Sequence, residues 1–283
     1  MSDGGGDRAL REREGIVFRE TPERDLTLDV YRPGPDAGSE SESEFEFQSE
    51  SGAGATGRPA LVYVHGGAWR DRNPREYRDG LRRLARAGLP CVNVTYRLSG
   101  EATYPAPVTD VAAGVGWTRA REWVDADRVA VGGLSAGAHL ATLVASARSR
   151  FVPEDAPATP DAAAAVGLSG VYDLEGAVAG DDAGETTPEE AFVGVPYRKA
   201  PDRYRAASPI AYVQDAPPTL LVHGTDDDVL SHEGARAYRQ ALAGAGVDAE
   251  FVSVDDGGHV FPFEEPWFEA TNDRIRTFLG TVL

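Results

Sequence analysis

Short apolar segments alternate with amphipathic segments from residue 59 to the C-terminus. The apolar segments have the length and composition of buried strands, and turn-forming residues bound them. Between them, apolar residues recur at helical spacing, as in the run that starts at Val108 and continues at positions 111, 112 and 115. The strand segments are PALVYVHGG at 59–67, PCVNVTYR at 90–97, VAVGGL at 129–134, AAAAVGLSGVYDL at 162–174, PTLLVHG at 218–224 and AEFVSV at 249–254.

This alternation predicts an α/β fold with a mostly parallel central sheet and helices on both faces. GIVFRE at 15–20 and RDLTLDVYRP at 24–33 read as two further strands that suit an antiparallel edge. In such sheets reactive groups gather beyond the carboxyl ends of the strands. The chain places its unusual residues at those ends, namely His65–Gly67, Ser135, His223–Asp228 and Asp255–His259.

Three segments depart from the alternation. Residues 1–15, with three successive glycines and alternating charges, are expected to be a disordered N-terminus. Residues 33–58 form an acidic low-complexity loop that lacks the apolar area needed to order itself. Residues 174–208 are rich in Gly, Pro and charge, which favours a lid-like insertion. Residues 16–283 are therefore expected to form one domain that contains both insertions.

The chain is strongly acidic, with 46 Asp and Glu against 28 Lys and Arg, a formal net charge of −18. This charge disfavours nucleic acid and anionic membranes as partners. One explanation is a highly soluble acidic enzyme. A second hypothesis is adaptation to a high-salt cytoplasm, where salt screens the repulsion between like charges. The second predicts a melting temperature that rises with KCl concentration. The sequence contains no 18-residue apolar run and no apolar signal segment at its start, so a cytoplasmic protein is expected.

A serine stands at the tip of the turn that follows the strand at 129–134. Gly133, Ser135 and Gly137 fit the pattern G-x-S-x-G, in which small residues leave room for a serine on a sharp strand-to-helix turn. A serine hydroxyl is a weak nucleophile at neutral pH and requires a histidine base that a carboxylate orients. Ser135 is thus a candidate nucleophile if the chain supplies those partners.

His259 is the natural base among the five histidines, because it alone lies late in the chain on a Gly-rich loop, DDGGHVF. His139 lies on a buried helical stripe, which favours a structural role with a ring nitrogen bonded inside the core. The other three histidines occupy a Gly turn at 65, a strand end at 223 and the first turn of a helix at 232.

The acid is expected in HGTDDDV at 223–229, which offers Asp226, Asp227 and Asp228. Adjacent side chains point in different directions, so at most one of the three faces the loop that carries His259. The residue types alone leave the choice open.

An oxyanion hole needs backbone N–H groups that are free to face a developing negative charge. One is expected from Ala136, directly after the candidate nucleophile. The others are expected from Gly67 and Ala68 in the turn HGGAW.

Taken together, these motifs resemble those of α/β-hydrolase carboxylesterases, the group that includes feruloyl-esterase-like, hormone-sensitive-lipase-like and arylformamidase-like enzymes. HGGAW resembles the group's oxyanion motif, GLSAGAHLA at 133–141 its nucleophile turn, and DDGGHVF its histidine loop. HGTDDDV resembles the acid motif HGxxDxxV, and aligning the two assigns the acid to Asp227. The chain departs from the group in carrying Ala68 for a third glycine. It also has GLS where the lipase-like branch has GDS.

The resemblance implies an α/β-hydrolase fold and hydrolysis of a small to medium carboxylic ester through an acyl-enzyme. Ser135, His259 and Asp227 would form the catalytic triad, and the N–H groups of Gly67, Ala68 and Ala136 the oxyanion hole. No metal or cofactor is required. The expected partner is a small-molecule ester, and the residues that bind it are not assigned.

Two alternatives stay open. An arylformamidase or a peptidase-type amide hydrolase uses the same triad, so the motifs do not separate ester from amide cleavage. A non-catalytic binding protein of the same fold is the other alternative, although such proteins often lack a triad member. The absence of G-x-G-x-x-G and P-loop patterns after the strand at 59–67 gives no support to nucleotide binding.

Overall fold

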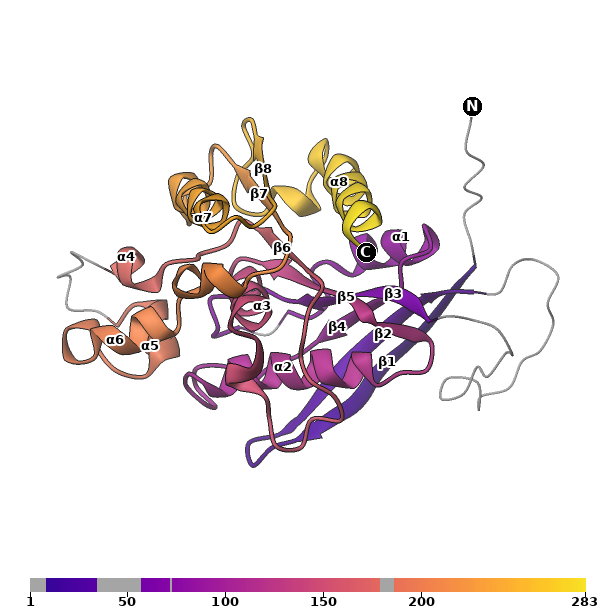
Figure 1. Ribbon diagram of the computed structural model, residues 1–283, viewed down its shortest axis with the longest axis horizontal. Coiled ribbons are helices and arrows are strands. Elements are labelled where there is room, and N and C mark those ends of the chain that lie inside the picture. The colour runs from indigo at the N-terminus through magenta and orange to yellow at the C-terminus, as the bar shows by residue number, and fades with distance from the viewer. Residues whose placement is uncertain (1–8, 35–56, 72, 179–185) are drawn as a thin grey trace.

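The computed structural model describes residues 9–34, 57–71, 73–178 and 186–283. In these ranges eight strands form one sheet, in the order β1-β2-β4-β3-β5-β6-β7-β8 (Figure 1). β2 is antiparallel to both β1 and β4, and all other neighbouring strands are parallel. The strands are β1 (Leu10–Glu20), β2 (Asp25–Pro33), β3 (Arg58–Val64), β4 (Cys91–Val94), β5 (Val124–Leu134), β6 (Ala164–Leu168), β7 (Thr219–Gly224) and β8 (Ala249–Val254).

Helices cover both faces of the sheet because side chains alternate along each buried strand. In β3, Val62 and Val64 join the core under α2 and α3, whereas Leu61 and Tyr63 join the core under α1 and α8. Figure 1 shows α1 and α8 side by side, away from α2. The predicted α/β fold with a mostly parallel sheet is therefore confirmed. The helices are α1 (Arg78–Arg86), α2 (Ala106–Arg119), α3 (Ala136–Ala147), α4 (Leu174–Val178), α5 (Pro188–Val193), α6 (Pro201–Ala206), α7 (His232–Gly244) and α8 (Trp267–Val282).

The expected disorder at the N-terminus is wrong for residues 10–15, which belong to β1. Their alternating charges do not prevent a strand because β1 pairs along its length with β2. Glu12 and Glu14 also form ion pairs with Arg82 and Arg78 of α1. These pairings stabilise an edge strand that has little apolar content. Residues 1–8 lie outside the described residues, as does most of the predicted acidic loop, at 35–56.

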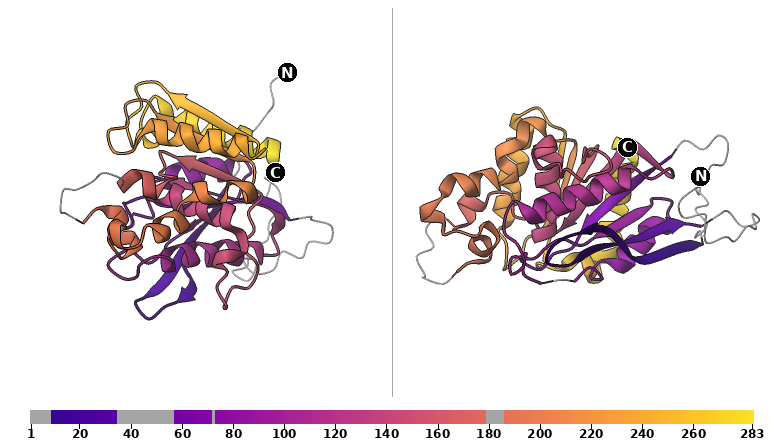
Figure 2. Two further views of the ribbon diagram at one scale, coloured as in Figure 1. Left: turned by 60° about the vertical axis from the view of Figure 1, so that its left-hand side comes forward. Right: turned by 90° about the horizontal axis from the view of Figure 1, so that it is seen from below.

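The segment at 174–208 carries short helices rather than irregular chain, with 179–185 outside the described residues. Figures 1 and 2 show α4, α5 and α6 together at one end of the molecule. Phe192 and Tyr204 of this segment are fully buried in the main core, where Phe192 stacks on Trp69. The segment thus contributes to the core, and its opening as a lid stays a prediction.

Helix α1 begins at Arg78, after a turn over residues 74–77. In the described part of the chain, no helix combines the length and apolar character needed to span a bilayer.

A buried carboxylate joins the antiparallel edge to the parallel part of the sheet. Asp110 of α2 is fully buried, and both of its oxygens accept hydrogen bonds from the Arg97 guanidinium, at 2.8 and 2.9 Å. Arg19 of β1 donates to the same carboxylate at 2.9 Å. The three side chains therefore tie β1 and the segment after β4 to one helix.

We predict that Asp110→Asn lowers the free energy of unfolding by about 3 kcal/mol, because it leaves two largely buried arginines without their shared charge. Urea denaturation measures the change. As a control, Asp202→Asn removes one partner of an exposed ion pair with Arg205 and is expected to cost less than about 1 kcal/mol. Equal losses in the two variants would contradict the role given to Asp110.

Candidate active site

Ser135 lies at the junction of β5 and α3 in a strained backbone conformation, with φ 54° and ψ −121°. A left-handed conformation of this kind costs a non-glycine residue about 1–3 kcal/mol and is held only by its surroundings. Here the end of β3 holds Ser135 in this conformation. A Cβ atom at Gly133 or Gly137 would overlap the carbonyl oxygen of Val64, so both positions require glycine. The sequence pattern G-x-S-x-G thus has a direct packing cause.

The structure brings Ser135, His259 and Asp227 into one line of hydrogen bonds. His259 lies in the loop after β8, and its Nε2 is 3.0 Å from Ser135 Oγ. Its Nδ1 lies 2.9 Å from Asp227 Oδ2 and 3.1 Å from Oδ1. An ionised carboxylate only accepts, so Nδ1 carries the proton and Nε2 accepts from the serine hydroxyl. This tautomer is the one that general-base catalysis requires.

Asp227 is the one member of the three-aspartate run whose carboxylate contacts His259. Its side chain is fully buried, and Oδ1 also accepts the backbone N–H groups of Val229 and Leu230 at 2.9 and 2.8 Å. Asp226 and Asp228 are exposed. The geometry therefore agrees with the alignment that selected Asp227.

A second histidine, His223, holds the same carboxylate and was not singled out by sequence reasoning. Its Nε2 lies 3.0 Å from Asp227 Oδ2 and 3.1 Å from the Leu230 carbonyl oxygen. Burial raises the pKa of Asp227, but hydrogen bonds from His223, His259 and the two backbone amides outweigh it and hold the pKa well below its usual range. The signal in the sequence is a histidine at a buried strand end, four residues before the acid.

The turn HGGAW lies against the nucleophile. A Cβ atom on Gly66 would lie 3.4 Å from Ser135 Cβ. Gly67, Ala68 and Trp69 all have left-handed φ, at 105°, 49° and 56°. Within the described residues, the hydrogen bonds give no acceptor to the N–H of Gly67 or Ala68.

Ala136, directly after Ser135, provides the third N–H group of the predicted oxyanion hole. It is the first residue of α3, and the first N–H groups of a helix have no acceptor inside the helix. The positive end of the helix dipole adds to the attraction for an anion there. In the described structure the N–H groups of Gly67, Ala68 and Ala136 thus have no competing acceptor.

Trp69 and His139 fasten the turn to the core. Trp69 Nε1–H donates to His139 Nδ1 at 3.3 Å, and His139 Nε2–H donates to the Ala207 carbonyl at 2.7 Å. Burial lowers the pKa of His139 to about 4, against the opposing effect of the Ala207 bond, so the ring stays neutral. The structural role predicted for His139 is confirmed. Among the described residues, no group of three or more His, Cys, Asp or Glu side chains is arranged to bind a metal ion.

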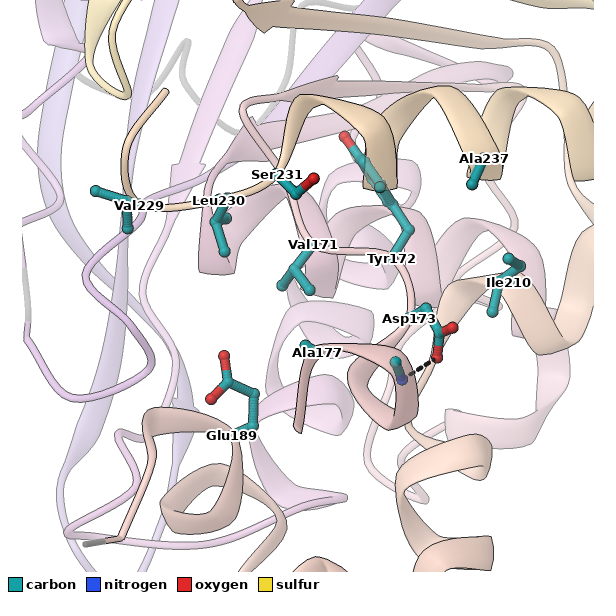
Figure 3. Close-up of a pocket in the computed structure, with 13 residues that line it drawn as sticks. Val171, Tyr172, Asp173, Ala177, Glu189, Ile210, Val229, Leu230, Ser231 and Ala237 are labelled. Carbon is teal, nitrogen blue, oxygen red and sulfur yellow. Dashed lines mark hydrogen bonds between the residues drawn. The ribbon is translucent and has the colours of Figure 1, made fainter. Parts of the chain in front are cut away.

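A pocket of about 510 Å³ lies next to the loop that carries Asp227 (Figure 3). It adjoins the Asp227 loop through Val229 and Leu230, and it reaches Gly170, two residues after the carbonyl that accepts the Ser135 N–H. Figure 3 shows Val171 and Leu230 pointing into the pocket from one side and Glu189 from the other. The pocket has the size of a small-ligand site.

The BD-FAE family model matches residues 49–242 of this chain. Two curated relatives are the esterases LipQ and LipC of Mycobacterium tuberculosis. Both are 33% identical to the chain and match over 72% of it, but the chain covers only 50% and 53% of their lengths. The chain thus spans about half the length of these relatives. A shorter match, 37% identical over 40% of the chain, is to a kynurenine formamidase, avaC, of Aspergillus versicolor.

Solved structures share the fold over almost the whole chain. One is the esterase Est2 from the planctomycete Thermogutta terrifontis, with a TM-score of 0.75 at 23% identity. The match covers 99% of this chain and 96% of the Est2 chain. A truncated carbohydrate esterase from gut microbiota has a TM-score of 0.75 at 22% identity, with 97% and 98% covered.

The family model covers the nucleophile turn, the oxyanion turn and the acid loop, and it ends before the loop that carries His259. The solved structures extend the same fold through that loop. The predicted resemblance to α/β-hydrolase carboxylesterases is confirmed, and the chain belongs to the BD-FAE family.

Proposed function

We propose that this chain is a carboxylic ester hydrolase that works through an acyl-enzyme on Ser135. One observation carries the proposal: Ser135 Oγ, His259 and Asp227 form an unbroken line of hydrogen bonds beside three unpaired N–H groups. A nucleophile, an oriented base and an oxyanion hole are the parts that acyl transfer needs. The esterase relatives support the same reaction class.

In the first half of the reaction, Ser135 Oγ attacks the ester carbonyl carbon while His259 Nε2 takes the hydroxyl proton. The carbonyl oxygen becomes an oxyanion, which the N–H groups of Gly67, Ala68 and Ala136 stabilise. The tetrahedral intermediate then collapses. The bond to the alcohol oxygen breaks, and His259 returns the proton to the leaving alcohol.

In the second half, a water molecule attacks the acyl-enzyme, again with His259 as the base. Collapse releases the carboxylic acid and restores the Ser135 hydroxyl. Asp227 stabilises the imidazolium in both halves because its surroundings keep it ionised. In this proposal His223 orients Asp227 and takes no part in proton transfer.

We assign the acyl chain of the ester to the pocket beside Asp227. Its lining includes apolar side chains from three separate elements, which favours a small to medium acyl group. The aromatic residues Phe192 and Tyr204 of the neighbouring segment are buried packing residues and do not line the pocket. Tyr172 lies at the wall.

Amide hydrolysis is the second candidate, and the avaC match favours it over part of the chain. Parallel assays with N-formylkynurenine and p-nitrophenyl butyrate separate the two reactions. The expected cytoplasmic location, the small-molecule partner and the absence of nucleic-acid or membrane partners stay proposals. So does the single domain over residues 16–283.

Ser135→Ala is expected to lower kcat for p-nitrophenyl acetate by at least about 10⁴-fold, because the acyl-enzyme no longer forms. Circular dichroism should show an unchanged fold. The parent should be labelled by a serine-reactive phosphonate, and the variant should not. Activity of the variant within about tenfold of the parent would refute the assignment.

Asp227→Asn is expected to lower kcat by about 10⁴-fold, because an amide can hold His259 in the wrong tautomer. Asp226→Asn and Asp228→Asn remove the same charge at exposed neighbours and are the matched controls, with changes of less than about threefold. Kinetics with p-nitrophenyl acetate compares the three. A larger effect at either neighbour would overturn the choice of Asp227.

Ala177→Phe is expected to narrow the pocket from the α4 side. The value of kcat/KM for p-nitrophenyl hexanoate should fall at least about tenfold, with little change for the acetate, because only the longer acyl chain needs the lost volume. Ala243→Phe, an exposed position of α7 outside the pocket, is the control. Equal effects on both esters would argue against an acyl site there.

A further inference from the structure

Glu76 belongs to none of the recognised motifs, yet its carboxylate is bonded to the turn that forms the proposed oxyanion hole. It lies in the turn over residues 74–77, directly before α1. Its Oε1 accepts the N–H of Gly66 at 2.5 Å. The side chain is partly buried, so water does not compete freely for this bond.

The carbonyl oxygen of Gly66, like its N–H, has hydrogen-bond partners. It accepts from His65 Nδ1–H at 2.8 Å and from the Tyr96 hydroxyl at 3.3 Å. In a trans peptide the C=O of one residue and the N–H of the next point in opposite directions. Fixing the Gly66 carbonyl therefore fixes the direction of the Gly67 N–H, one of the three proposed oxyanion donors. Glu76 fixes the preceding peptide group, because it accepts the N–H of Gly66.

The charge of Glu76 also acts on the base. Burial raises the pKa of Glu76 to about 7, while the Gly66 N–H and the charge of His259 act in the opposite direction. The other titratable groups that interact with this carboxylate are Tyr63 of β3 and Tyr96 after β4. Burial raises the pKa of both phenols, so both stay neutral. Among these groups, His259 is thus the one whose charge acts on Glu76.

We infer that Glu76 is a positioning residue, which holds the oxyanion turn through Gly66 and places a second carboxylate near His259. The inference rests on the proposed ester hydrolysis. An ionised carboxylate makes a stronger hydrogen bond to an N–H than a neutral acid does. It also favours the imidazolium that forms when His259 takes the serine proton.

The sign of the pH effect follows from these contacts. Above about pH 7 Glu76 is ionised, and both contributions are present. Below about pH 7 it gains a proton, and both weaken. Part of the activity of the parent should therefore be lost as the pH falls through about 7, because Glu76 becomes neutral there. The advantage of the parent over a variant that lacks this charge should therefore disappear over the same pH range.

Glu76→Gln keeps an oxygen acceptor for Gly66 and removes the charge. We expect kcat/KM for p-nitrophenyl acetate to fall about tenfold at about pH 8.5 but less than about twofold at about pH 5.5, where the parent carboxyl is also neutral. Glu76→Ala leaves the Gly66 N–H unpaired and should lose about 100-fold at about pH 8.5. Asp79→Asn removes an exposed charge three residues away and is the matched control, with an unchanged profile.

A constant ratio of kcat/KM between the parent and Glu76→Gln across the pH range would overturn the inference while leaving ester hydrolysis intact. A smaller fraction of folded protein lowers kcat/KM by the same factor at both pH values, so it does not imitate the expected change in this ratio. A parent that neither hydrolyses esters nor reacts with a serine-reactive phosphonate would instead overturn the proposed function, and the inference with it.

Discussion

The close packing of β3 against the nucleophile turn is the constraint on which the site depends. The Val64 carbonyl lies so near Gly133 and Gly137 that neither position tolerates a side chain. Ser135, between them, is held with φ at 54°, a conformation that it would leave if the surrounding sheet were not rigid. Its hydroxyl then lies within hydrogen-bonding distance of His259. The buried sheet thus maintains a strained residue where the chemistry is proposed.

Two carboxylates act on His259, and their surroundings differ. Asp227 receives hydrogen bonds from His223 and two backbone amides, which hold its pKa low despite burial. Glu76 receives one backbone N–H, and burial raises its pKa to about 7. Asp227 therefore stays charged at neutral pH, whereas Glu76 titrates near pH 7. Environments that separate the pKa values of neighbouring acids are the usual means of giving them different roles.

Local patterns predicted most of the elements because strand and helix periodicities are short-range properties of the chain. They failed at residues 10–15, where a charged sequence forms a strand through pairing with β2 and ion pairs to α1. They also failed at 174–208, where Phe192 and Tyr204 are core residues. In both places the deciding contacts come from segments far away in the sequence.

By itself the sequence determined the order of strands and helices, the small-residue turn around Ser135 and the candidates for base and acid. The resemblance to the acid motif selected Asp227 among its neighbours, and the tertiary structure showed that its carboxylate meets His259. Only the tertiary structure showed that His223 bonds to Asp227 and that Glu76 bonds to Gly66. His259 is 32 residues from its acid and 124 from the serine. Contacts over such separations depend on how the elements pack around the sheet, and the spacing of residues along the chain does not encode that packing.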